Sequence, residues 1–386
     1  MNILFLFDWP INPRVGGVQR VTDVLAREFL SRGHRVFFLC TQEDGTNYEC
    51  DFSCPQFKLD CTNDNLGKEY KTILEENKIE VIINQEARTN TLLLLSLTPS
   101  YIKRITCFHT LPFLAIGRER HLLKYRDRNT VKSFLYWLFC SIYPKYYSYS
   151  STKLEKQRIL ESYSLSDKLC FESSRYFSRV KAVLPSLDES RFISISNPCP
   201  FKRRSIKLCK EKIIMWAGRH DNTSKNFEKF VDFWKVFSSI NLDWKAVVVG
   251  DGPDWLSNIK YANKKNVERI VFTGNVPEIE PYYFKATFFC MTSVAEGFPM
   301  VLLEAMNYQC IPVAFDTFES LHDIIEDDVN GIIVNPYNVN EMSNRISNLI
   351  INPSAIYSMQ KNAAQKVANF TVTAAIDKWE SILNSI

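Results

Sequence analysis

Two glutamates, Glu296 and Glu304, flank a Gly-Phe-Pro turn in the second half of the chain. The apolar run Thr287–Met291 predicts a buried strand before the turn, and Met300–Tyr308 predicts a helix after it. A helical side chain leans toward the helix N-terminus, so Glu304 points to the same mouth of a possible binding site, at the end of the strand, as Glu296 does. That mouth lies at the carboxyl end of the strand, where open α/β sheets bind ligands.

The turn between the glutamates adds backbone donors to this mouth. Gly297 permits a tight turn, and Pro299 suits the first turn of a helix. The backbone N–H groups of Gly297, Phe298 and Met300 point toward the same mouth, as they do at the start of a helix. Carboxylates accept hydrogen bonds from hydroxyl groups and amides donate to them, which suits a polyhydroxyl ligand. Taken singly, either glutamate fits an ordinary structural role better, as a helix-dipole partner or a solvated loop residue.

A second charged group lies on the loop Ala217–Asn226, between the apolar run Ile213–Ala217 and a predicted helix at Phe227–Phe237. Arg219 can bind a diphosphate through two parallel hydrogen bonds, and Lys225 adds a point charge. The helix N-terminus adds its dipole. Two solvated loop cations are the alternative, which the place of this loop at the ligand-binding end of a strand disfavours.

Two weaker signals come from the first half of the chain. Gly16 and Gly17 precede the first predicted helix, but a dinucleotide-binding fingerprint needs a third glycine at fixed spacing. The glycine pair alone is explained equally well by a turn. His109 follows the apolar run Ile105–Phe108. A lone histidine at a strand end fits a structural role as well as a functional one.

These stretches resemble the signature of the retaining GT-B glycosyltransferases, the "glycosyl transferases group 1" family. The resemblance covers nearly all of residues 213–350 and, more loosely, 1–40 and 100–200. It implies that Glu296 contacts the donor sugar and Glu304 the ribose hydroxyls, while Arg219 and Lys225 grip the leaving diphosphate. It also implies that the loop with Gly16 and Gly17 approaches the donor phosphate or the acceptor, and that His109 lies near the acceptor.

The implied site can be stated residue by residue. Gly250–Pro253 resembles a further family loop, and Gly274–Val276 resembles the loop near the nucleotide base. The family often has glycine at the position of Asn226, and usually glycine near Gln309 or Cys310. The implied catalytic residues are His109, Arg219, Lys225 and Glu296. The implied donor-binding residues are Gly16, Gly17, Arg219, Lys225, Gly274, Asn275, Val276, Glu296, Gly297, Phe298, Pro299, Met300 and Glu304.

The elements that must position these residues alternate between strand and helix. A strand at Ile3–Phe7, a helix at Val18–Leu30 ended by Gly33 and a strand at His34–Cys40 form a βαβ unit, which implies a parallel sheet. The pattern restarts after a basic, polar segment at 202–212, which we interpret as a linker. Further strands are expected at Val81–Asn84, Ile105–Phe108, Lys168–Glu172, Ile193–Ser196, Ile213–Ala217, Ala246–Val249, Arg269–Thr273, Thr287–Met291, Ile311–Phe315 and Gly331–Val334.

We therefore expect the α/β class, in the GT-B form of two Rossmann-like domains facing across a cleft. Residues 1–203 would form an acceptor-binding domain and 204–370 a nucleotide-sugar-binding domain. The last helix, 371–386, would cross back to the first domain, as the resemblance implies.

The composition is that of a folded globular protein with 386 residues, 46% hydrophobic and 23% charged. The net charge of +4 is far below that of a dedicated nucleic-acid binder, so we expect no nucleic-acid partner. The 11 cysteines are odd in number and contain no Cys-x-x-Cys pair, which indicates reduced thiols of a cytoplasmic protein. The spacing of Cys40, Cys50, Cys54 and Cys61 fits no common zinc finger. The N-terminus has no basic leader or cleavage site of a secretory signal.

No metal cofactor is expected. The sequence has no two aspartates spaced two apart, the pattern with which the other large glycosyltransferase fold binds a metal ion. Arg219 and Lys225 would replace the ion electrostatically.

The segment 118–158 mixes many Arg and Lys residues with aromatic ones. Such a face suits the surface of an anionic membrane, and a core-facing aromatic stripe with a solvated basic side is an equal alternative. The apolar stretch Phe134–Tyr143 is too short to span a bilayer. We expect a cytoplasmic protein, peripheral at the inner face of the cell membrane if this segment binds lipid.

The predicted function is retaining transfer of a hexose from a nucleotide-diphosphate donor to a saccharide or lipid-linked acceptor, in synthesis of cell-surface polysaccharide or glycolipid. An epimerase of sugar nucleotides on the same fold is the first alternative. A non-catalytic module that binds sugar nucleotide or membrane is the second, and the intact charged residues speak against it. A dinucleotide-dependent oxidoreductase is disfavoured by the missing third glycine.

Overall fold

The computed structural model of the protein describes residues 1–13, 16–42, 54–125, 130–201 and 209–386. Part of the expected linker (202–208), Cys50 of the cysteine cluster and residues 126–129 of the basic segment lie outside these ranges. All the cysteines in the described ranges are free thiols.

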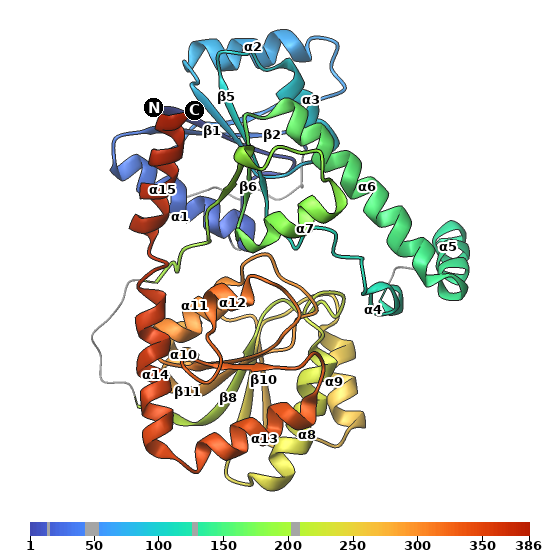
Figure 1. The fold of residues 1–386 in the computed structure, drawn as a ribbon, viewed down its shortest axis with the longest axis vertical. Coiled ribbons are helices and arrows are strands. Elements are labelled where there is room, and N and C mark those ends of the chain that lie inside the picture. The colour runs from blue at the N-terminus through green and yellow to red at the C-terminus, as the bar shows by residue number, and fades with distance from the viewer. Residues whose placement is uncertain (14–15, 43–53, 126–129, 202–208) are drawn as a thin grey trace. The chain divides into compact units, whose positions relative to one another are not determined.

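The chain forms two compact units (Figure 1). The first comprises residues 1–116, 148–198 and 372–386, and the second comprises 117–147 and 199–371. These units differ from the ranges drawn from the sequence mainly at 117–147, which belongs to the second unit. The last helix groups with the first unit from residue 372 onward.

The first unit contains a seven-stranded parallel sheet with the order β3-β2-β1-β4-β5-β6-β7. The chain order reverses between β1 and β4. The strands are β1 (Asn2–Phe7), β2 (Arg35–Cys40), β3 (Gln56–Lys58), β4 (Val81–Asn84), β5 (Lys103–Phe108), β6 (Lys168–Phe171) and β7 (Phe192–Ser194). The helices are α1 (Gly17–Ser31), α2 (Leu66–Glu76), α3 (Thr89–Leu97), α7 (Arg175–Val183), the 3-10 turn η1 (Glu189–Arg191) and α15 (Val372–Ser385). Helix α6 (Pro144–Leu165) has its first residues in the second unit's range and the rest in the first's.

The second unit contains a six-stranded parallel sheet with the order β10-β9-β8-β11-β12-β13, which reverses between β8 and β11. Its strands are β8 (Glu211–Ala217), β9 (Lys245–Val249), β10 (Ile270–Gly274), β11 (Ala286–Met291), β12 (Ile311–Phe315) and β13 (Ile332–Val334). Its helices are α4 (Glu119–Lys124), α5 (Val131–Ile142), α8 (Phe227–Ile240), α9 (Trp255–Lys264), α10 (Glu280–Lys285), α11 (Met300–Asn307), α12 (Leu321–Ile324), α13 (Val339–Ile350) and α14 (Pro353–Val367).

Burial on both faces explains the central strands of these sheets. All six residues of β11 are buried, as are all five of β12. A parallel strand that is covered on both faces reads as a continuous apolar run rather than as an alternating one. Helix α8 covers the second sheet with an aromatic face, in which Phe227, Phe230, Trp234 and Phe237 are fully buried.

The helix ends follow from local sequence as well. Gly33 adopts a φ of +84° just after α1, and His34 N donates to Phe29 O at 3.1 Å, which closes the helix as a glycine in the left-handed region does. Asn226 stands before α8 with a φ of +50°, and Gln309 follows α11 with a φ of +60°. These are positions at or beside which the resembled family has glycine. Asparagine tolerates this conformation, whereas glutamine adopts it less readily.

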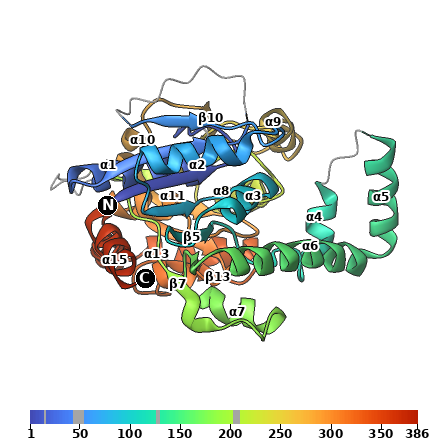
Figure 2. The same cartoon turned by 90° about the horizontal axis from the view of Figure 1, so that it is seen from above.

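Helix α15 packs against α1 within the first unit (Figure 2). Arg32, which follows α1, donates through Nη1 to Asp377 at 2.6 Å and to Glu380 at 2.7 Å. His34 Nε2 lies 2.9 Å from the other oxygen of Glu380. The end of the chain is therefore part of the unit that its beginning forms.

Candidate functional site

Three of the charged residues singled out in the second half of the chain, Arg219, Lys225 and Glu296, lie on two loops at the carboxyl ends of β8 and β11. These neighbouring strands mark the point where the strand order reverses, which is where open α/β sheets bind ligands. Lys225 Nζ, from the loop after β8, lies 2.6 Å from Glu296 Oε1, from the loop after β11. Ser293 Oγ donates to the same oxygen at 2.6 Å. The structure therefore brings together two residues that lie 71 positions apart in the sequence.

Arg219 lies on the same loop as Lys225 and is more exposed. Its Nη2 donates to Asp221 Oδ2 at 2.7 Å, and its side chain is 63% exposed. The side chains of Lys225 and Glu296 are only 24% and 14% exposed. Arg219 is therefore accessible to an anionic ligand, and Lys225 is held in place by a partner.

The loop that carries Arg219 and Lys225 rests on a neighbouring glycine loop. A Cβ atom on Gly250 would lie 2.0 Å from Gly218 O, and one on Gly252 would lie 2.6 Å from His220 O. Both glycines have positive φ values, +122° and +159°. The sequence Gly250–Pro253 thus lets two backbone segments approach more closely than any side chain would permit.

Buried polar side chains fix the shape of this loop. Asn222 Oδ1 accepts from Phe227 N at 3.1 Å, and Asn222 Nδ2 donates to Asn258 Oδ1 at 2.7 Å. Asn258 Nδ2 in turn lies 2.8 Å from His220 Nδ1. Since the amide donates there, the neutral imidazole carries its hydrogen on Nε2. Burial lowers the pKa of His220 to about 4, and the charge of Asp251 opposes that shift only partly.

Glu304 lies on α11 and is fully buried, and its Oε2 accepts from the Tyr283 hydroxyl at 3.0 Å. The turn between the two glutamates is buried too: Gly297 O accepts from Ser320 Oγ at 2.6 Å, Phe298 and Met300 are 4% and 8% exposed, and Pro299 takes the N-cap position of α11. The carboxylate of Glu304 is therefore closed to solvent in this structure.

Gly274 is the last residue of β10, the outer strand of the same sheet, and Asn275 and Val276 follow it. Strand β9 separates β10 from β8, so these residues share the carboxyl edge but stand two strands away from the reversal point. Gly274 has a φ of +71°, and its carbonyl oxygen accepts from Gly250 N at 2.8 Å. Asn275 is exposed and Val276 is half-buried.

In the first unit, Gly16 and Gly17 begin α1, and His109 follows β5. A Cβ atom on either glycine would meet nothing within 4 Å, so that turn is open. His109 lies between two acceptors: Nδ1 is 3.1 Å from Glu172 Oε1, and Nε2 is 2.5 Å from Gln85 Oε1. Both ring nitrogens are therefore engaged by the protein.

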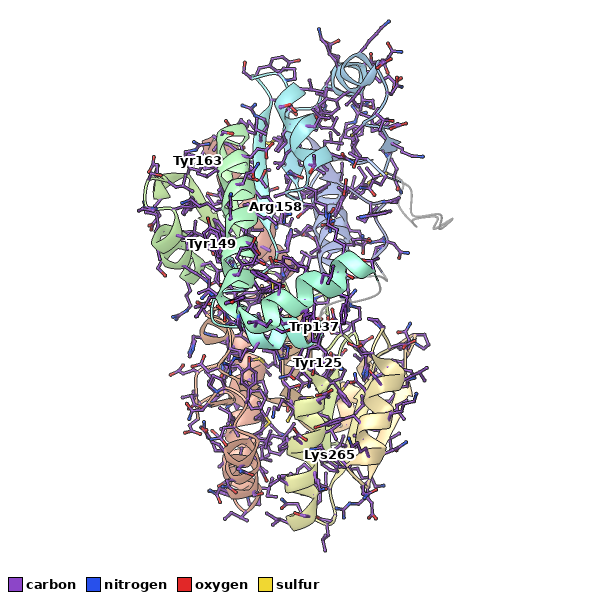
Figure 3. All side chains as sticks on the ribbon, turned by 90° about the vertical axis from the view of Figure 1, so that its right-hand side faces the viewer. Tyr125, Trp137, Tyr149, Arg158, Tyr163 and Lys265 are labelled. Carbon is purple, nitrogen blue, oxygen red and sulfur yellow. The ribbon has the colours of Figure 1, made fainter. Side chains whose placement is uncertain are left out.

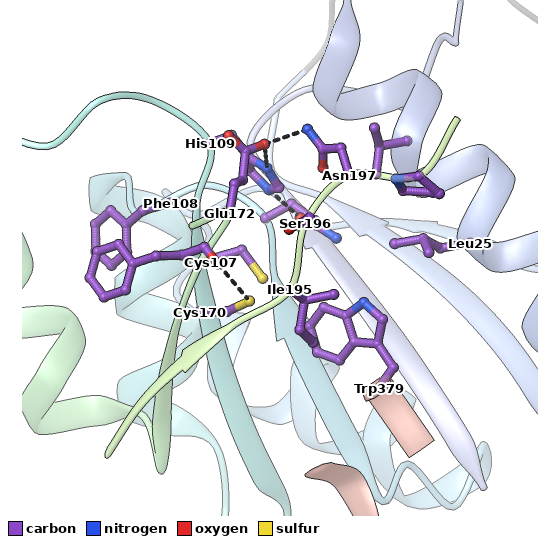
Figure 4. A pocket seen from close by; sticks show the side chains of 14 residues that line it. Leu25, Cys107, Phe108, His109, Cys170, Glu172, Ile195, Ser196, Asn197 and Trp379 are labelled. Carbon is purple, nitrogen blue, oxygen red and sulfur yellow. Dashed lines mark hydrogen bonds and ion pairs between the residues drawn. The ribbon is translucent and has the colours of Figure 1, made fainter. Parts of the chain in front are cut away.

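A cavity opens beside His109 at the carboxyl ends of β4 to β7 (Figure 4). Glu172 and Trp379 line it and are 4% and 3% exposed. Among the described residues, Glu172 Oε2 and Trp379 Nε1 have no hydrogen-bond partner. Gln85, Glu172 and Asn197 were not among the residues predicted for the site. Asn197 Nδ2 donates to Glu172 Oε1 at 2.6 Å. Their position is the signal that could have found them, because Glu172 ends a predicted strand of the parallel sheet and the other two directly follow one.

In the part of the chain that the structure describes, no group of three or more His, Cys, Asp or Glu side chains is arranged to hold a metal ion. Within the same part of the chain, no helix combines the length and apolar character needed to cross a bilayer.

Comparison with known proteins gives a family match for part of the chain. Residues 211–352 match the family model "Glycosyl transferases group 1". An uncharacterized glycosyltransferase of Haemophilus influenzae is 27% identical over 50% of this chain and 55% of its own length. The amylovoran biosynthesis glycosyltransferase AmsD of Erwinia amylovora is 32% identical over 45% of this chain and 49% of its own length. The chain thus spans about half the length of the curated relatives it matches.

A third relative acts on a lipid-linked saccharide, according to its name. It is an N-acetylgalactosaminyltransferase of Campylobacter jejuni that extends an undecaprenol-diphosphate-linked glycan, and it is 22% identical over 57% of this chain and 58% of its own length.

The solved structures match over the whole chain. TarM has a TM-score of 0.75 at 13% identity, covering 100% of this chain and 99% of its own. The apo galactosyltransferase WaaB has a TM-score of 0.71 at 14% identity, with coverage of 100% and 99%. HepE of Anabaena in complex with UDP has a TM-score of 0.73 at 15% identity, with full coverage of both chains. These likenesses confirm the predicted fold class, GT-B with two parallel-sheet Rossmann-like domains.

Proposed function

We propose that this protein is a glycosyltransferase that moves a hexose from a nucleotide-diphosphate donor to a saccharide or lipid-linked acceptor. The proposal is based on the ion pair between Lys225 and Glu296, whose charged groups are 2.6 Å apart. The pair lies where the strand order of the second sheet reverses. The range 211–352 that matches the glycosyltransferase family contains both residues.

The chemistry of the two loops fits a diphosphate leaving group. Phosphate oxygens gain charge as the bond to the sugar breaks, and fixed cations at that place stabilise the transition state. Arg219 is exposed for bidentate contact, and Lys225, further along the same loop, is anchored by Glu296. Glu296, on the other loop, can stabilise the positive charge that the sugar ring develops. We further propose that no metal ion is needed and that the anomeric configuration is retained, as the family resemblance implies.

The acceptor side of the proposal rests on the relatives. AmsD serves amylovoran synthesis, and the Campylobacter relative extends an undecaprenol-linked glycan. By analogy, we place this chain in the synthesis of a cell-surface polysaccharide or glycolipid. We propose His109 and the polar groups around it as contacts for that acceptor.

The basic, aromatic segment of the chain supports a membrane surface as a partner. In α5 and just beyond it, seven large apolar side chains are 44% to 65% exposed, namely Phe134, Leu135, Leu138, Phe139, Ile142, Tyr143 and Tyr146. The neighbouring Lys132 and Lys145 are exposed as well. Figure 3 shows this helix beside the label of Trp137. Such a helix suits the interface of an anionic bilayer, so we propose peripheral attachment at the inner face of the cell membrane.

A donor screen tests the enzymatic proposal. Thermal unfolding is measured with several nucleotide sugars, since a ligand of the native state alone raises the melting temperature. The stabilising donor is then assayed for transfer in the presence of excess chelator. Arg219→Ala should lower turnover about a hundredfold or more, the usual effect of removing one preorganised charge. Lys235→Ala, at an exposed position on α8, is the control.

Two results would refute the proposal. One is a folded Arg219→Ala variant with unchanged turnover. The other is conversion of the donor to another sugar nucleotide without any acceptor, which would identify the epimerase instead. If chelator abolishes activity and magnesium or manganese restores it, only the proposed independence of metal ions is refuted.

A further inference from the structure

The short helix α4, from the first half of the sequence, contacts both charged loops of the second unit. Arg118, at its N-cap, donates through Nε to Val294 O at 3.2 Å. Its Nη2 donates to the carbonyl oxygen of Thr317, on the loop after β12. Thr317 Oγ1 in turn donates to Ser293 O at 2.7 Å. One guanidinium therefore holds the carbonyl oxygen of Val294, which follows Ser293, and that of Thr317, whose hydroxyl donates to Ser293. Ser293 is the residue whose hydroxyl donates to Glu296.

His121 makes the equivalent contact with the other loop. Its Nε2 lies 3.1 Å from Asn222 O and 3.2 Å from Thr223 O. Burial lowers the pKa of His121, so the ring is neutral at ordinary pH and its Nε2–H group is shared by the two carbonyl oxygens. Asn222 and Thr223 stand just before Lys225. On the next turn of α4, Lys124 Nζ lies 2.5 Å from Glu228 Oε2, in the first turn of α8.

The two loops are also joined directly. Val294 N donates to Ser224 O at 2.7 Å, and Thr292 Oγ1 donates to Lys225 O at 3.1 Å. Val294 thus receives a hydrogen bond from Arg118 at its carbonyl oxygen and gives one to the other loop through its N–H. Arg118 and His121 complete the set of hydrogen bonds that fixes Lys225 and Glu296 relative to each other.

We propose that Arg118 and His121 are positioning residues for the donor, which hold the loops after β8 and β11 in the arrangement that binds a nucleoside diphosphate. This inference rests on the proposed function. Both residues lie outside the range 211–352 that matches the family. They act through backbone carbonyl oxygens, and misplacement of a binding group by about 1 Å can cost a hundredfold in rate.

Calorimetry with nucleoside diphosphates tests the proposal. UDP, GDP and ADP are titrated into the wild-type protein, and the tightest binder is then titrated into Arg118→Met and His121→Phe. Each variant should bind it about tenfold more weakly or worse, since each loses a hydrogen bond to a backbone carbonyl that becomes unsatisfied. Arg120→Ala, an exposed residue of the same helix, should bind like the wild type.

Hydrogen exchange and conservative variants separate positioning from loss of fold. Without ligand, amides of residues 218–226 and 293–299 should exchange faster in both variants, while those of β8 and β11 keep their protection. Arg118→Lys and His121→Gln retain a donor and should recover part of the affinity. In transfer assays the weakened variants should show a raised KM for the donor as well as a lowered kcat.

The outcomes distinguish the two claims. A wild-type protein that binds none of the three diphosphates defeats the proposed function and this inference together. A wild-type protein that binds one of them, with unchanged affinity in Arg118→Met and His121→Phe, defeats only the positioning role. The positioning role is also refuted if Arg120→Ala weakens diphosphate binding as much as the Arg118 and His121 variants do. It is refuted likewise if these variants lose amide protection throughout the second unit.

Discussion

Lys225 and Glu296 neutralise each other in the ligand-free protein, with 2.6 Å between Nζ and Oε1. A diphosphate that binds to this loop competes for the lysine ammonium group. Under the proposed function, Lys225 would turn to phosphate, and the Glu296 carboxylate, to which the Ser293 hydroxyl donates, would face the sugar. The ion pair thus holds the side chains of Lys225 and Glu296 in fixed positions in the absence of a ligand.

We predict that Glu296 and Glu304 have separable roles. The ribose does not change during transfer, so Glu304→Gln should weaken ground state and transition state alike and raise KM with little change in kcat. The sugar gains positive charge, so Glu296→Gln should lower kcat as well as kcat/KM. In calorimetry, the nucleoside diphosphate should bind Glu296→Gln almost normally and Glu304→Gln poorly. Equal weakening in both variants, or the reverse order, would show that the roles are wrongly assigned.

The burial of His220 predicts a loss of stability in acid. Its pKa is about 4 in the folded protein and about 6.5 when unfolded, so the unfolded chain takes up the proton first as the pH falls. The contribution of neutral His220 is complete above pH 6.5 and is lost as the pH falls toward 4. The difference amounts to about 3 kcal/mol of unfolding free energy.

Urea unfolding of the wild type and of His220→Gln at about pH 7.5 and pH 4 checks this prediction. Glutamine does not titrate, so the wild type should lose roughly 3 kcal/mol more than the variant between the two pH values. If both proteins lose the same unfolding free energy, the pKa of His220 is not lowered in the folded state.

How well the sequence predicts a site depends on where its residues lie. Lys225 and Glu296 each follow an apolar run, and parallel strands bring such positions to one edge of a sheet, so their meeting could be anticipated. Arg118 and His121 could not, because nothing in the sequence around them shows that 117–147 packs with the second unit. The burial of Glu304 was also unforeseen, since a helical position alone does not reveal what covers it.

At the scale of elements, buried parallel strands were the easiest to predict. Val81–Asn84 and Ile311–Phe315 have the predicted bounds, and other expected strands differ by a residue or two at their ends. Such strands are short apolar runs between polar loops, which is a strong local signal. Strand β3 was missed because its three residues, Gln56–Lys58, alternate in exposure and lie at the edge of the sheet.

Helix α5 carries a prediction of its own. Leu138 and Ile142 stand one turn apart on its exposed face, at 44% and 65% exposure. Wild-type protein should float with anionic vesicles at low salt, where electrostatic attraction is strongest, and the double variant Leu138→Ser, Ile142→Ser should lose most of that binding. Ile351→Ser, at a lone apolar residue with 80% exposure, should behave like the wild type.

Absence of flotation by the wild type at low salt would contradict membrane attachment. If the wild type is instead a dimer in solution and the double variant a monomer, the apolar face belongs to a contact between two copies.

At the scale of the whole molecule, the chain ends in the unit where it begins. Trp379 on α15 is 3% exposed and lines the cavity beside His109. Replacing a buried aromatic residue by alanine costs about 3–5 kcal/mol, so Trp379→Ala should destabilise the first unit by that amount. Tyr357→Ala, at a residue of α14 with 69% exposure, should change stability little.

Hydrogen exchange during mild denaturation localises the effect. Trp379→Ala should speed exchange in β1 to β7 more than in β8 to β13. Equal acceleration in both sheets would mean that the two units unfold as one.

Helix α4 also contacts α5: Trp137 of α5 donates through Nε1 to Leu123 O at 3.1 Å. Residues of α4 thus contact the loops after β8 and β11 as well as the apolar helix α5. Binding at two places that share such a link forms a closed thermodynamic cycle, and the coupling is then equal in both directions. If a nucleotide changes the affinity of α5 for a bilayer by some factor, the bilayer changes the affinity for the nucleotide by the same factor. The dissociation constant for the donor should therefore be measured both in buffer and on vesicles. The ratio of the two values is the coupling between nucleotide binding and membrane binding.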